Sequence, residues 1–235
     1  MNTERIQISG EAETELSLHV KHAFDLMTAG TGKLPEELLK LHGMSGKKYR
    51  IFVNNLVECV PNARYLEVGS WAGSTLCSAI YGNTVKATAI DNWSEFGGPS
   101  NKFFSNLGQF ISSSNSVSVI TSDFRKVSYQ SIGTHNIYLF DGPHAREDQY
   151  DGVYLALSAL DEIFILIVDD WNWDYVRSGT FGAIKDTNCG ILYSIEILST
   201  EGDVHPGTIG LPVEENSDWH NGYFIGVLQK NVSAK

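Results

Sequence analysis

The chain has 235 residues, 42% of them hydrophobic, which suits one α/β domain with a large core and leaves little room for two domains. Asp and Glu number 28 against 17 Lys and Arg, so the formal net charge is −11 and nothing supplies the phosphate neutralisation that nucleic-acid binding needs. We therefore expect neither nucleic acid nor an anionic membrane as a partner.

Export and membrane insertion are not expected either. The first thirty residues mix charged and apolar side chains and contain no apolar stretch of the kind that a secretory signal needs. No window approaches the roughly 18 apolar residues of a membrane span. Three widely spaced cysteines, Cys59, Cys77 and Cys189, fit reduced thiols better than a disulfide framework or a zinc site. The sequence therefore predicts a cytoplasmic protein.

The first part of the chain, residues 1–60, has a helical pattern. From about Glu11 to Val57 most apolar residues recur at spacings of three and four, the period of an amphipathic helix. The stretch Gly30-Thr31-Gly32 separates two helices. We predict an N-terminal helical extension, whose helices could form a homo-oligomer contact, cover a bound cofactor or pack on the sheet.

Residues 61–235 alternate between short apolar runs and longer amphipathic segments, as expected for parallel strands joined by right-handed helical crossovers. Five runs are predicted parallel strands, and the last of them is apolar at every position, as in a strand covered on both faces: Tyr65–Val68, Lys86–Ile90, Val117–Thr121, Asn136–Phe140 and Ile163–Val168. Two more strands, near Ile191–Leu198 and Tyr223–Leu228, should form an antiparallel hairpin. The predicted fold is therefore a doubly wound, Rossmann-like α/β domain with a seven-stranded, mostly parallel sheet.

Polar residues follow each of the five parallel strands at its carboxyl end, where open α/β sheets bind ligands. A glycine turn, Glu67-Val68-Gly69-Ser70-Trp71-Ala72-Gly73-Ser74-Thr75, follows the first strand. The later strands are followed by Asp91-Asn92, Ser122-Asp123, Asp141-Gly142-Pro143-His144 and Asp169-Asp170-Trp171.

The residues at the first three strand ends favour a nucleoside ligand with a cationic group. Gly69 and Gly73 let the backbone approach a ligand, and Glu67 would repel a diphosphate but could hold a cationic amino-acid moiety. Asp91 can accept both ribose hydroxyls, and Asp123 can accept an adenine amino group. A nicotinamide-binding turn would instead carry a third glycine, in the pattern G-x-G-x-x-G.

The runs YLEVGSWAGSTLCSAI, TAIDNW, TSDF and LFDGPHAREDQYDGVYLAL resemble the class I S-adenosylmethionine-dependent methyltransferases. Within them the chain is most similar to the group around macrocin O-methyltransferase, in which a strand ending in Asp-Gly-x-His is followed by a helix and a strand ending in Asp-Asp. The resemblance covers roughly residues 62–186. The chain departs from the pattern at Leu160-Asp161-Glu162, where relatives usually carry Gly-Gly, and at Pro143, where Asp is frequent.

The resemblance implies S-adenosyl-L-methionine as the cofactor and assigns residues to it. The methionine part would contact Glu67, Gly69, Ser70, Trp71, Gly73, Ser74 and Thr75, the ribose Asp91 and Asn92, and the adenine Ser122 and Asp123, with Trp93 and Phe124 on its faces. Asp141 would lie beside the cofactor. His144 would lie near the acceptor and is expected to act as general base, with Asp141 as the second catalytic residue.

A divalent metal ion is a further expectation. Asp141 and the pair Asp169-Asp170 end neighbouring strands, which lie about 4.8 Å apart in a sheet, so three carboxylates would meet at one edge. Adjacent carboxylates repel each other, and a cation such as Mg²⁺ is the natural reason to keep both. The alternatives are that Asp170 caps the next helix and that Asp141 contacts the cofactor or a backbone amide.

The sequence thus predicts a methyltransferase that methylates a hydroxyl of a small-molecule acceptor with the assistance of Mg²⁺. Aminopropyl transfer, a nicotinamide-dependent reaction on the same scaffold and a non-catalytic cofactor-binding module are the alternatives. The long loop from Thr200 to Gly222 is a candidate acceptor-binding flap.

Overall fold

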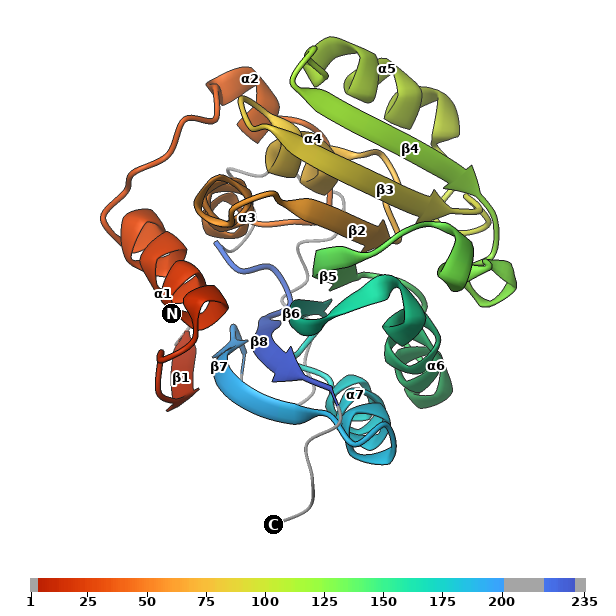
Figure 1. The fold of residues 1–235 in the computed structure, drawn as a ribbon. Helices are drawn as coiled ribbons and strands as arrows, with labels where there is room; N and C mark the ends of the chain where they lie inside the picture. The colour runs from red at the N-terminus through yellow and green to blue at the C-terminus, as the bar shows by residue number, and fades with distance from the viewer. Residues whose placement is uncertain (1–3, 201–217, 231–235) are drawn as a thin grey trace.

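The computed structural model describes residues 4–200 and 218–230, which fold around one eight-stranded sheet (Figure 1). The strands lie in the order β1-β7-β8-β6-β5-β2-β3-β4. Strands β2 to β6 run parallel to their neighbours, whereas β8 is antiparallel to β6 and β7, and β7 is antiparallel to β1. Their bounds are β1 Arg5–Gly10, β2 Arg64–Val68, β3 Val85–Asp91, β4 Asn115–Thr121, β5 His135–Phe140, β6 Leu160–Asp169, β7 Gly190–Leu198 and β8 Tyr223–Gln229.

The predicted doubly wound, mostly parallel sheet with a C-terminal antiparallel hairpin is confirmed, but the predicted number of strands is one too few. Residues Arg5–Gly10 form β1, which pairs with β7 from Arg5 opposite Leu198 to Gly10 opposite Tyr193. All six residues of β1 are exposed, so the strand lacks the burial that makes a strand conspicuous in a sequence. The N-terminal extension is therefore not purely helical, because its first segment joins the sheet.

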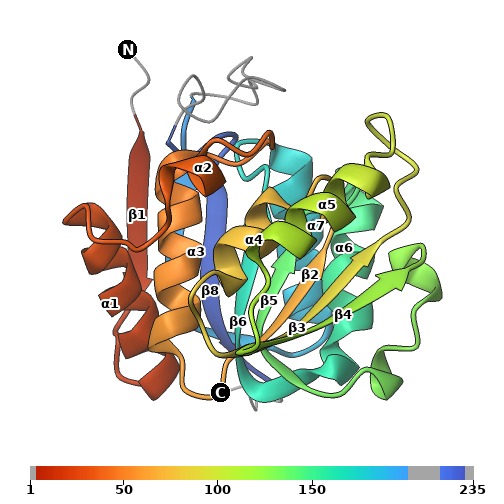
Figure 2. The ribbon, with the colours of Figure 1, turned by 90° about the horizontal axis from the view of Figure 1, so that it is seen from above.

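Helices cover both faces of the sheet (Figures 1 and 2). Their bounds are α1 Glu15–Thr28, α2 Glu36–Leu39, α3 Lys47–Cys59, α4 Ser74–Ile80, α5 Ser100–Phe110, α6 Arg146–Ala156 and α7 Asp174–Asp186. The helices α1, α3 and α4 lie on one face, and α6 and α7 pack against each other on the other face. No described helix is both long and apolar enough to cross a bilayer.

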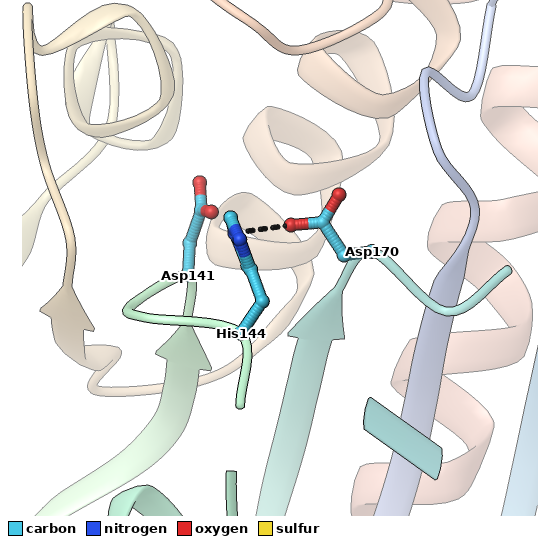
Figure 3. Close-up of side chains that lie close together, drawn as sticks. All are labelled: Asp141, His144 and Asp170. Carbon is cyan, nitrogen blue, oxygen red and sulfur yellow. Dashed lines mark ion pairs between the residues drawn. The ribbon is translucent and has the colours of Figure 1, made fainter. Parts of the chain in front are cut away.

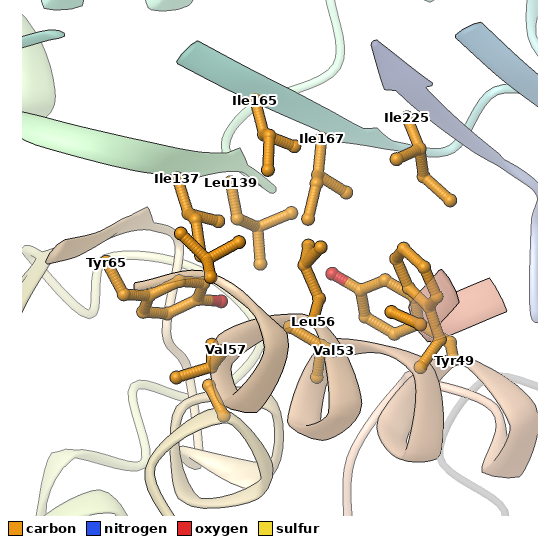
Figure 4. Close-up of a cluster of buried hydrophobic side chains, with 14 of the residues drawn as sticks. Tyr49, Val53, Leu56, Val57, Tyr65, Ile137, Leu139, Ile165, Ile167 and Ile225 are labelled. Carbon is orange, nitrogen blue, oxygen red and sulfur yellow. The ribbon is translucent and has the colours of Figure 1, made fainter. Parts of the chain in front are cut away.

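The two faces of the central strands build two separate cores, as the period-2 alternation of strand side chains requires. On one face, Ile137, Leu139, Ile165 and Ile167 pack under α3 (Figure 4). On the other face, the intervening side chains of the same strands, such as Tyr138, pack under α6 and α7. The sheet is thus buried on both sides, and its carboxyl edge remains as the place for a ligand.

The three cysteines are free, as predicted. Helix α3 packs on the sheet, which is one of the three roles expected for the N-terminal helices. Most of the predicted flap, residues 201–217, lies outside the described residues.

Candidate active site

A cavity of about 550 Å³ lies at the carboxyl ends of β2 to β6. This is the edge at which open α/β sheets bind ligands. Its lining comprises Met44, Val68, Gly69, Trp71, Ile90, Asp91, Asn92, Ser94, Glu95, Phe96, Ser122, Asp123, Phe124, Arg125, Asp141, Gly142, Pro143, His144, Asp148, Asp169, Asp170, Trp173 and His220. Every one of the five parallel strands contributes a residue at or just after its end.

The turn after β2 needs glycine at two positions. Gly69 has φ +88°, and a Cβ built there would lie 1.7 Å from the carbonyl oxygen of Asp141. Gly73, at φ +83°, begins α4, and its Cβ would lie 3.0 Å from the Phe103 ring. The absence of a side chain at Gly69 therefore lets the loops after β2 and β5 meet at the floor of the cavity.

Glu67 is fully buried in β2, directly before this turn. Its Oε2 accepts a hydrogen bond from the Tyr65 hydroxyl at 2.6 Å. Burial raises the pKa of Glu67 to about 7, although Tyr65 and Ser70 lower it in part. Glu67 Oε1 and the Ser70 hydroxyl are close neighbours that partner each other, although their geometry is not that of a normal hydrogen bond.

Asp91, at the end of β3, accepts hydrogen bonds from the loops that follow β2 and β3. Its Oδ2 accepts a hydrogen bond from the Trp71 backbone N–H at 2.7 Å, and its Oδ1 accepts one from the Trp93 backbone N–H at 2.6 Å. A carboxylate oxygen has a second lone pair, so each oxygen can still accept from a ligand hydroxyl. Asp91 lines the cavity and is available for that contact.

The aromatic side chains around this end of the cavity are arranged differently from the prediction. Trp93 is not part of the lining; its ring packs on Phe103 and Phe104, and its Nε1–H donates to the Trp71 carbonyl at 2.8 Å. Trp71 and Phe96 line the cavity instead, with the Trp71 Nε1–H donating to the Phe96 carbonyl at 3.1 Å.

Asp123 and Phe124 follow β4 and both line the cavity, as predicted for the adenine end. Asp123 Oδ1 accepts a hydrogen bond from the Arg125 backbone N–H at 3.0 Å. The Arg125 guanidinium lies 4.6 Å from the centre of the Phe124 ring and forms ion pairs with Asp148 and Asp151 of α6. These contacts hold the loop after β4 against α6.

Three aspartates meet where β5 and β6 end. Asp169 Oδ1 accepts from the Asp170 backbone N–H at 2.7 Å, and its Oδ2 accepts from the Tyr223 hydroxyl at 3.3 Å. Burial, together with the charges of Asp169 and Asp170, raises the pKa of Asp141 well above its ordinary value. Burial and the charge of Asp170 raise the pKa of Asp169 in the same way. Burial and mutual repulsion therefore favour the protonated forms of Asp141 and Asp169, and a bound cation would reverse that preference.

His144 lies against this cluster (Figure 3). Its Nε2 is 2.7 Å from Asp170 Oδ2, and Asn221 Nδ2 donates to Asp170 Oδ1 at 2.6 Å. Burial lowers the pKa of His144, but the hydrogen bond and charge of Asp170 outweigh burial, so the pKa lies above its ordinary value. Burial raises the pKa of Asp170, but His144 outweighs it, so this carboxyl has a lowered pKa and is ionised.

Asp141, His144 and Asp170 could together hold a cation. One ligand atom each from Asp141, His144 and Asp170 lies within 4.8 Å of the others. The predicted ligands were Asp141, Asp169 and Asp170, so the geometry places the His144 ring where the prediction placed the Asp169 carboxylate. Asp169 lines the cavity but is engaged by Asp170 and Tyr223.

Several lining residues have a backbone conformation that side chains other than glycine rarely adopt. Trp71, Phe96, Asp170 and His220 have φ between 43° and 59°. Each such residue costs of the order of 1–3 kcal/mol, which surrounding structure must offset. Four of the seven such non-glycine residues in the described parts of the chain line this one cavity.

The structure brings most of the predicted site residues to this cavity, and the others do not line it. Those that line it are Gly69, Trp71, Asp91, Asn92, Ser122, Asp123, Phe124, Asp141, His144, Asp169 and Asp170. Those that do not are Glu67, Ser70, Gly73, Ser74, Thr75 and Trp93. Ser74 and Thr75 instead lie 3.4 Å from the Ser45 hydroxyl, on the side of α4 that packs against the N-terminal segment.

Sequence reasoning missed the residues that reach the site from distant segments. Met44, Glu95 and His220 line the cavity, and Asn221 binds Asp170. Tyr49 of α3 is buried, stacks on Tyr223 with ring centres 3.7 Å apart, and has its pKa raised well above its ordinary value by burial and by the charge of Asp169. Of these, only Asn221-Gly222 carried a sequence signal, as a turn pair before the last strand.

No family model matches the chain, and no curated protein matches it. Solved structures do. Cofactor-bound Rv0187 from MTB is 12% identical, with a TM-score of 0.55 over 93% of this chain and 92% of that one. An O-methyltransferase from Bacillus cereus, solved in complex with SAH, is 14% identical, with a TM-score of 0.54 over 90% and 91%.

TrmN from Thermus thermophilus is 15% identical, with a TM-score of 0.54; the match covers 83% of this chain and 52% of TrmN, so the chain spans about half of that protein. At these identities the likeness is one of fold. With the strand order and the edge cavity, it shows that the chain has the Rossmann-like fold of methyltransferases.

Proposed function

We propose that the chain is an S-adenosylmethionine-dependent methyltransferase that methylates a hydroxyl group of a small-molecule acceptor. The observation that carries the proposal is the edge cavity, where Gly69, Asp91 and Asp123 lie at the ends of successive strands and the buried carboxyl of Glu67 lies directly before the glycine turn. A ligand ammonium close to this turn would favour the ionised form of the Glu67 carboxyl, whose pKa burial raises.

The residues at this edge fit the cofactor from one end to the other. Glu67 and Ser70 would hold its amino-acid part, Asp91 its ribose hydroxyls, and Asp123 with Phe124 its adenine. When bound, the cofactor supplies an electrophilic methyl group on a positively charged sulfur.

The His144–Asp170 pair supplies the base for the proposed reaction. In neutral His144, the Nε2–H donates to Asp170 and leaves Nδ1 to accept a proton. Asp170 stabilises the imidazolium that forms, and Asn221 fixes the Asp170 carboxylate. The acceptor O–H proton would pass to His144, which would leave the acceptor oxygen as the nucleophile for the methyl group that the cofactor supplies; the electron pair of the broken carbon–sulfur bond would stay on sulfur.

A divalent metal ion belongs to the proposal as an aid to this chemistry. The mixed carboxylate and imidazole set of Asp141, His144 and Asp170 fits such an ion, with Asp169 as a supporting acid. Bound there, the ion would neutralise the clustered charge and lower the pKa of an acceptor hydroxyl. His144 would then be a ligand and not the base, so metal binding and the base role of His144 are alternatives.

Calorimetric titration with S-adenosylmethionine tests the proposal, and Asp91→Ala tests its placement. The variant should bind about 1–3 kcal/mol more weakly, the loss expected for hydrogen bonds to a charged group. Asp25→Asn is the control, because Asp25 pairs with Lys21 on the surface of α1. Equal affinity of the wild type and Asp91→Ala would remove the assignment. Repeating the titration of the EDTA-treated protein with added Mg²⁺ tests the ion: identical heats and rates with and without it would leave the aspartates without a metal role.

A further inference from the structure

The lining of the active-site cavity carries a strong excess of negative charge. Seven of its side chains are acids, Asp91, Glu95, Asp123, Asp141, Asp148, Asp169 and Asp170, against one permanent cation, Arg125. Asp141 and Asp169 have raised pKa values and Asp170 pairs with His144, so the remaining negative charge comes mainly from Asp91, Glu95 and Asp123. The Arg125 charge is already committed to ion pairs with Asp148 at 2.6 Å and Asp151 at 2.7 Å. An anionic acceptor would therefore meet uncompensated repulsion as it entered.

Glu95 is the acid of this lining whose carboxylate has no partner among the described residues. It lies on the exposed loop after β3, and its carboxylate makes no hydrogen bond or ion pair with any residue in the described parts of the chain. By contrast, Asp148 pairs with Arg125 and accepts the Ala145 backbone N–H at 3.1 Å. Glu95 lines the same cavity as His144, and its charge contributes to the raised pKa of His144.

An aromatic wall lies beside His144. The Trp173 ring meets the His144 ring at 5.1 Å with an interplanar angle of 64°, and stacks on Tyr175 at 5.5 Å and 25°. Trp173 lines the cavity and is the N-cap residue of α7, three residues after Asp170. A planar ring held against this wall would keep its hydroxyl close to His144. A tryptophan face also attracts a cation.

From this charge and this wall, we propose that the acceptor is a phenol that carries a positively charged amine, with its ring on Trp173 and its ammonium towards Glu95. The inference rests on the proposed methyltransferase function. A ring hydroxyl is also easier for His144 to deprotonate than an aliphatic one. A phenol has a pKa of about 10, whereas water, taken here as the reference for an aliphatic hydroxyl, has a pKa of about 15.7.

Three para-substituted phenols that differ in charge test the proposal on the full chain: tyramine, 4-ethylphenol and 3-(4-hydroxyphenyl)propanoate. We expect kcat/KM for methyl transfer to decrease in that order, with tyramine at least about tenfold above the propanoate, the low end of electrostatic steering. About 1 M salt should compress the ratio, because it shortens the screening length to about 3 Å. Tyramine binding, measured by calorimetry without turnover, should show the same preference over the propanoate.

Glu95→Gln should reduce the ratio of kcat/KM for tyramine to that for 4-ethylphenol about two- to fivefold, the range of an exposed charge pair, because an effect through the His144 pKa is common to both phenols. Glu147→Gln is the matched control, because Glu147 is an exposed acid of α6 outside this lining, and it should change neither substrate. If Glu95 has only a structural role, Glu95→Gln would lower kcat/KM equally for tyramine and 4-ethylphenol. That result would overturn the assignment of Glu95 as the ammonium partner.

The outcomes separate this inference from the function on which it rests. Equal rates for the three phenols, preference for the propanoate, or no transfer to any phenol by a protein that binds S-adenosylhomocysteine would overturn the acceptor class alone. Failure to bind S-adenosylhomocysteine would overturn the proposed function and the inference together.

Discussion

At the scale of single residues, Glu67 is a buried acid whose protonation should depend on a bound ligand. Its carboxyl is fully buried and has a pKa of about 7, so in the ligand-free protein it is half protonated near neutral pH. Because the pKa is raised, the stability that this group contributes is present below the ordinary carboxyl pKa of 4.5 and is lost as pH rises through about 7. A ligand ammonium reverses the preference, because it favours the ionised carboxylate.

Binding of the proposed cofactor should therefore depend on pH. Below the Glu67 pKa of about 7, binding must displace a proton, so affinity for S-adenosylhomocysteine should rise with pH and level off above that value. Glu67→Gln should bind more weakly and lose this dependence. Calorimetry in two buffers of different ionisation enthalpy measures the proton release directly. A pH slope that survives in Glu67→Gln would assign the titration to another group.

The proposed base gives a second dependence on pH. His144 must be neutral to accept a proton, so the rate of methyl transfer should rise with pH through its raised pKa and fall as the imidazole becomes protonated. Asp170→Asn removes the carboxylate that raises this pKa and should move the rising limb to lower pH. His144→Gln should lose about 10²- to 10⁴-fold in rate, whereas His22→Gln on α1 should lose nothing. Full activity of His144→Gln would show that another group accepts the proton.

The candidate site could be predicted from the sequence only where its residues follow a strand. Asp91, Asp123, Asp141 and Asp170 each stand at a strand end, so the parallel topology alone brings them to one edge. Glu95 reaches the same cavity from a loop whose path depends on backbone angles such as φ 47° at Phe96. No periodicity in a sequence encodes that path.

At the scale of elements, the structure confirms every predicted strand to within a few residues, because each buried strand is a short apolar run. Strand β1 was missed for the opposite reason: Ile6 and Ile8 alternate with polar residues, but both are about half exposed and the run has only two apolar positions. Two apolar residues do not separate a strand from a loop. Strand β1 depends on the free edge of β7, which is set by the rest of the fold.

The turn between β2 and α4 is the element that the site depends on most. In Gly69→Ala, the new Cβ would lie 1.7 Å from the Asp141 carbonyl oxygen at φ +88°, so the two loops would have to separate. Gly97→Ala is a matched control, because Gly97 has φ +81° but nothing lies within 4 Å of its Cβ. Urea unfolding should show a loss of about 1–2 kcal/mol for Gly97→Ala, from the left-handed conformation alone, and at least about 4 kcal/mol for Gly69→Ala. Equal losses would mean that the close approach of the two loops is unimportant.

At the scale of the whole molecule, the sheet is covered on both faces and open at one edge. The two cores fix the central strands from both sides, and the loops at the carboxyl edge carry the acids, the left-handed residues and the cavity. A net charge of −11 agrees with a site that receives a cationic cofactor. Rigid strands and a polar edge are the arrangement that a group-transfer enzyme needs to hold two reactants in contact.

The most direct test of this account is a calorimetric titration of the whole chain with S-adenosylhomocysteine and, separately, with NAD⁺. The account predicts one S-adenosylhomocysteine per chain and no saturable binding of NAD⁺, because the buried Glu67 carboxyl lies where a diphosphate would need a donor. Saturable binding of NAD⁺, or the absence of any heat with S-adenosylhomocysteine, would contradict it.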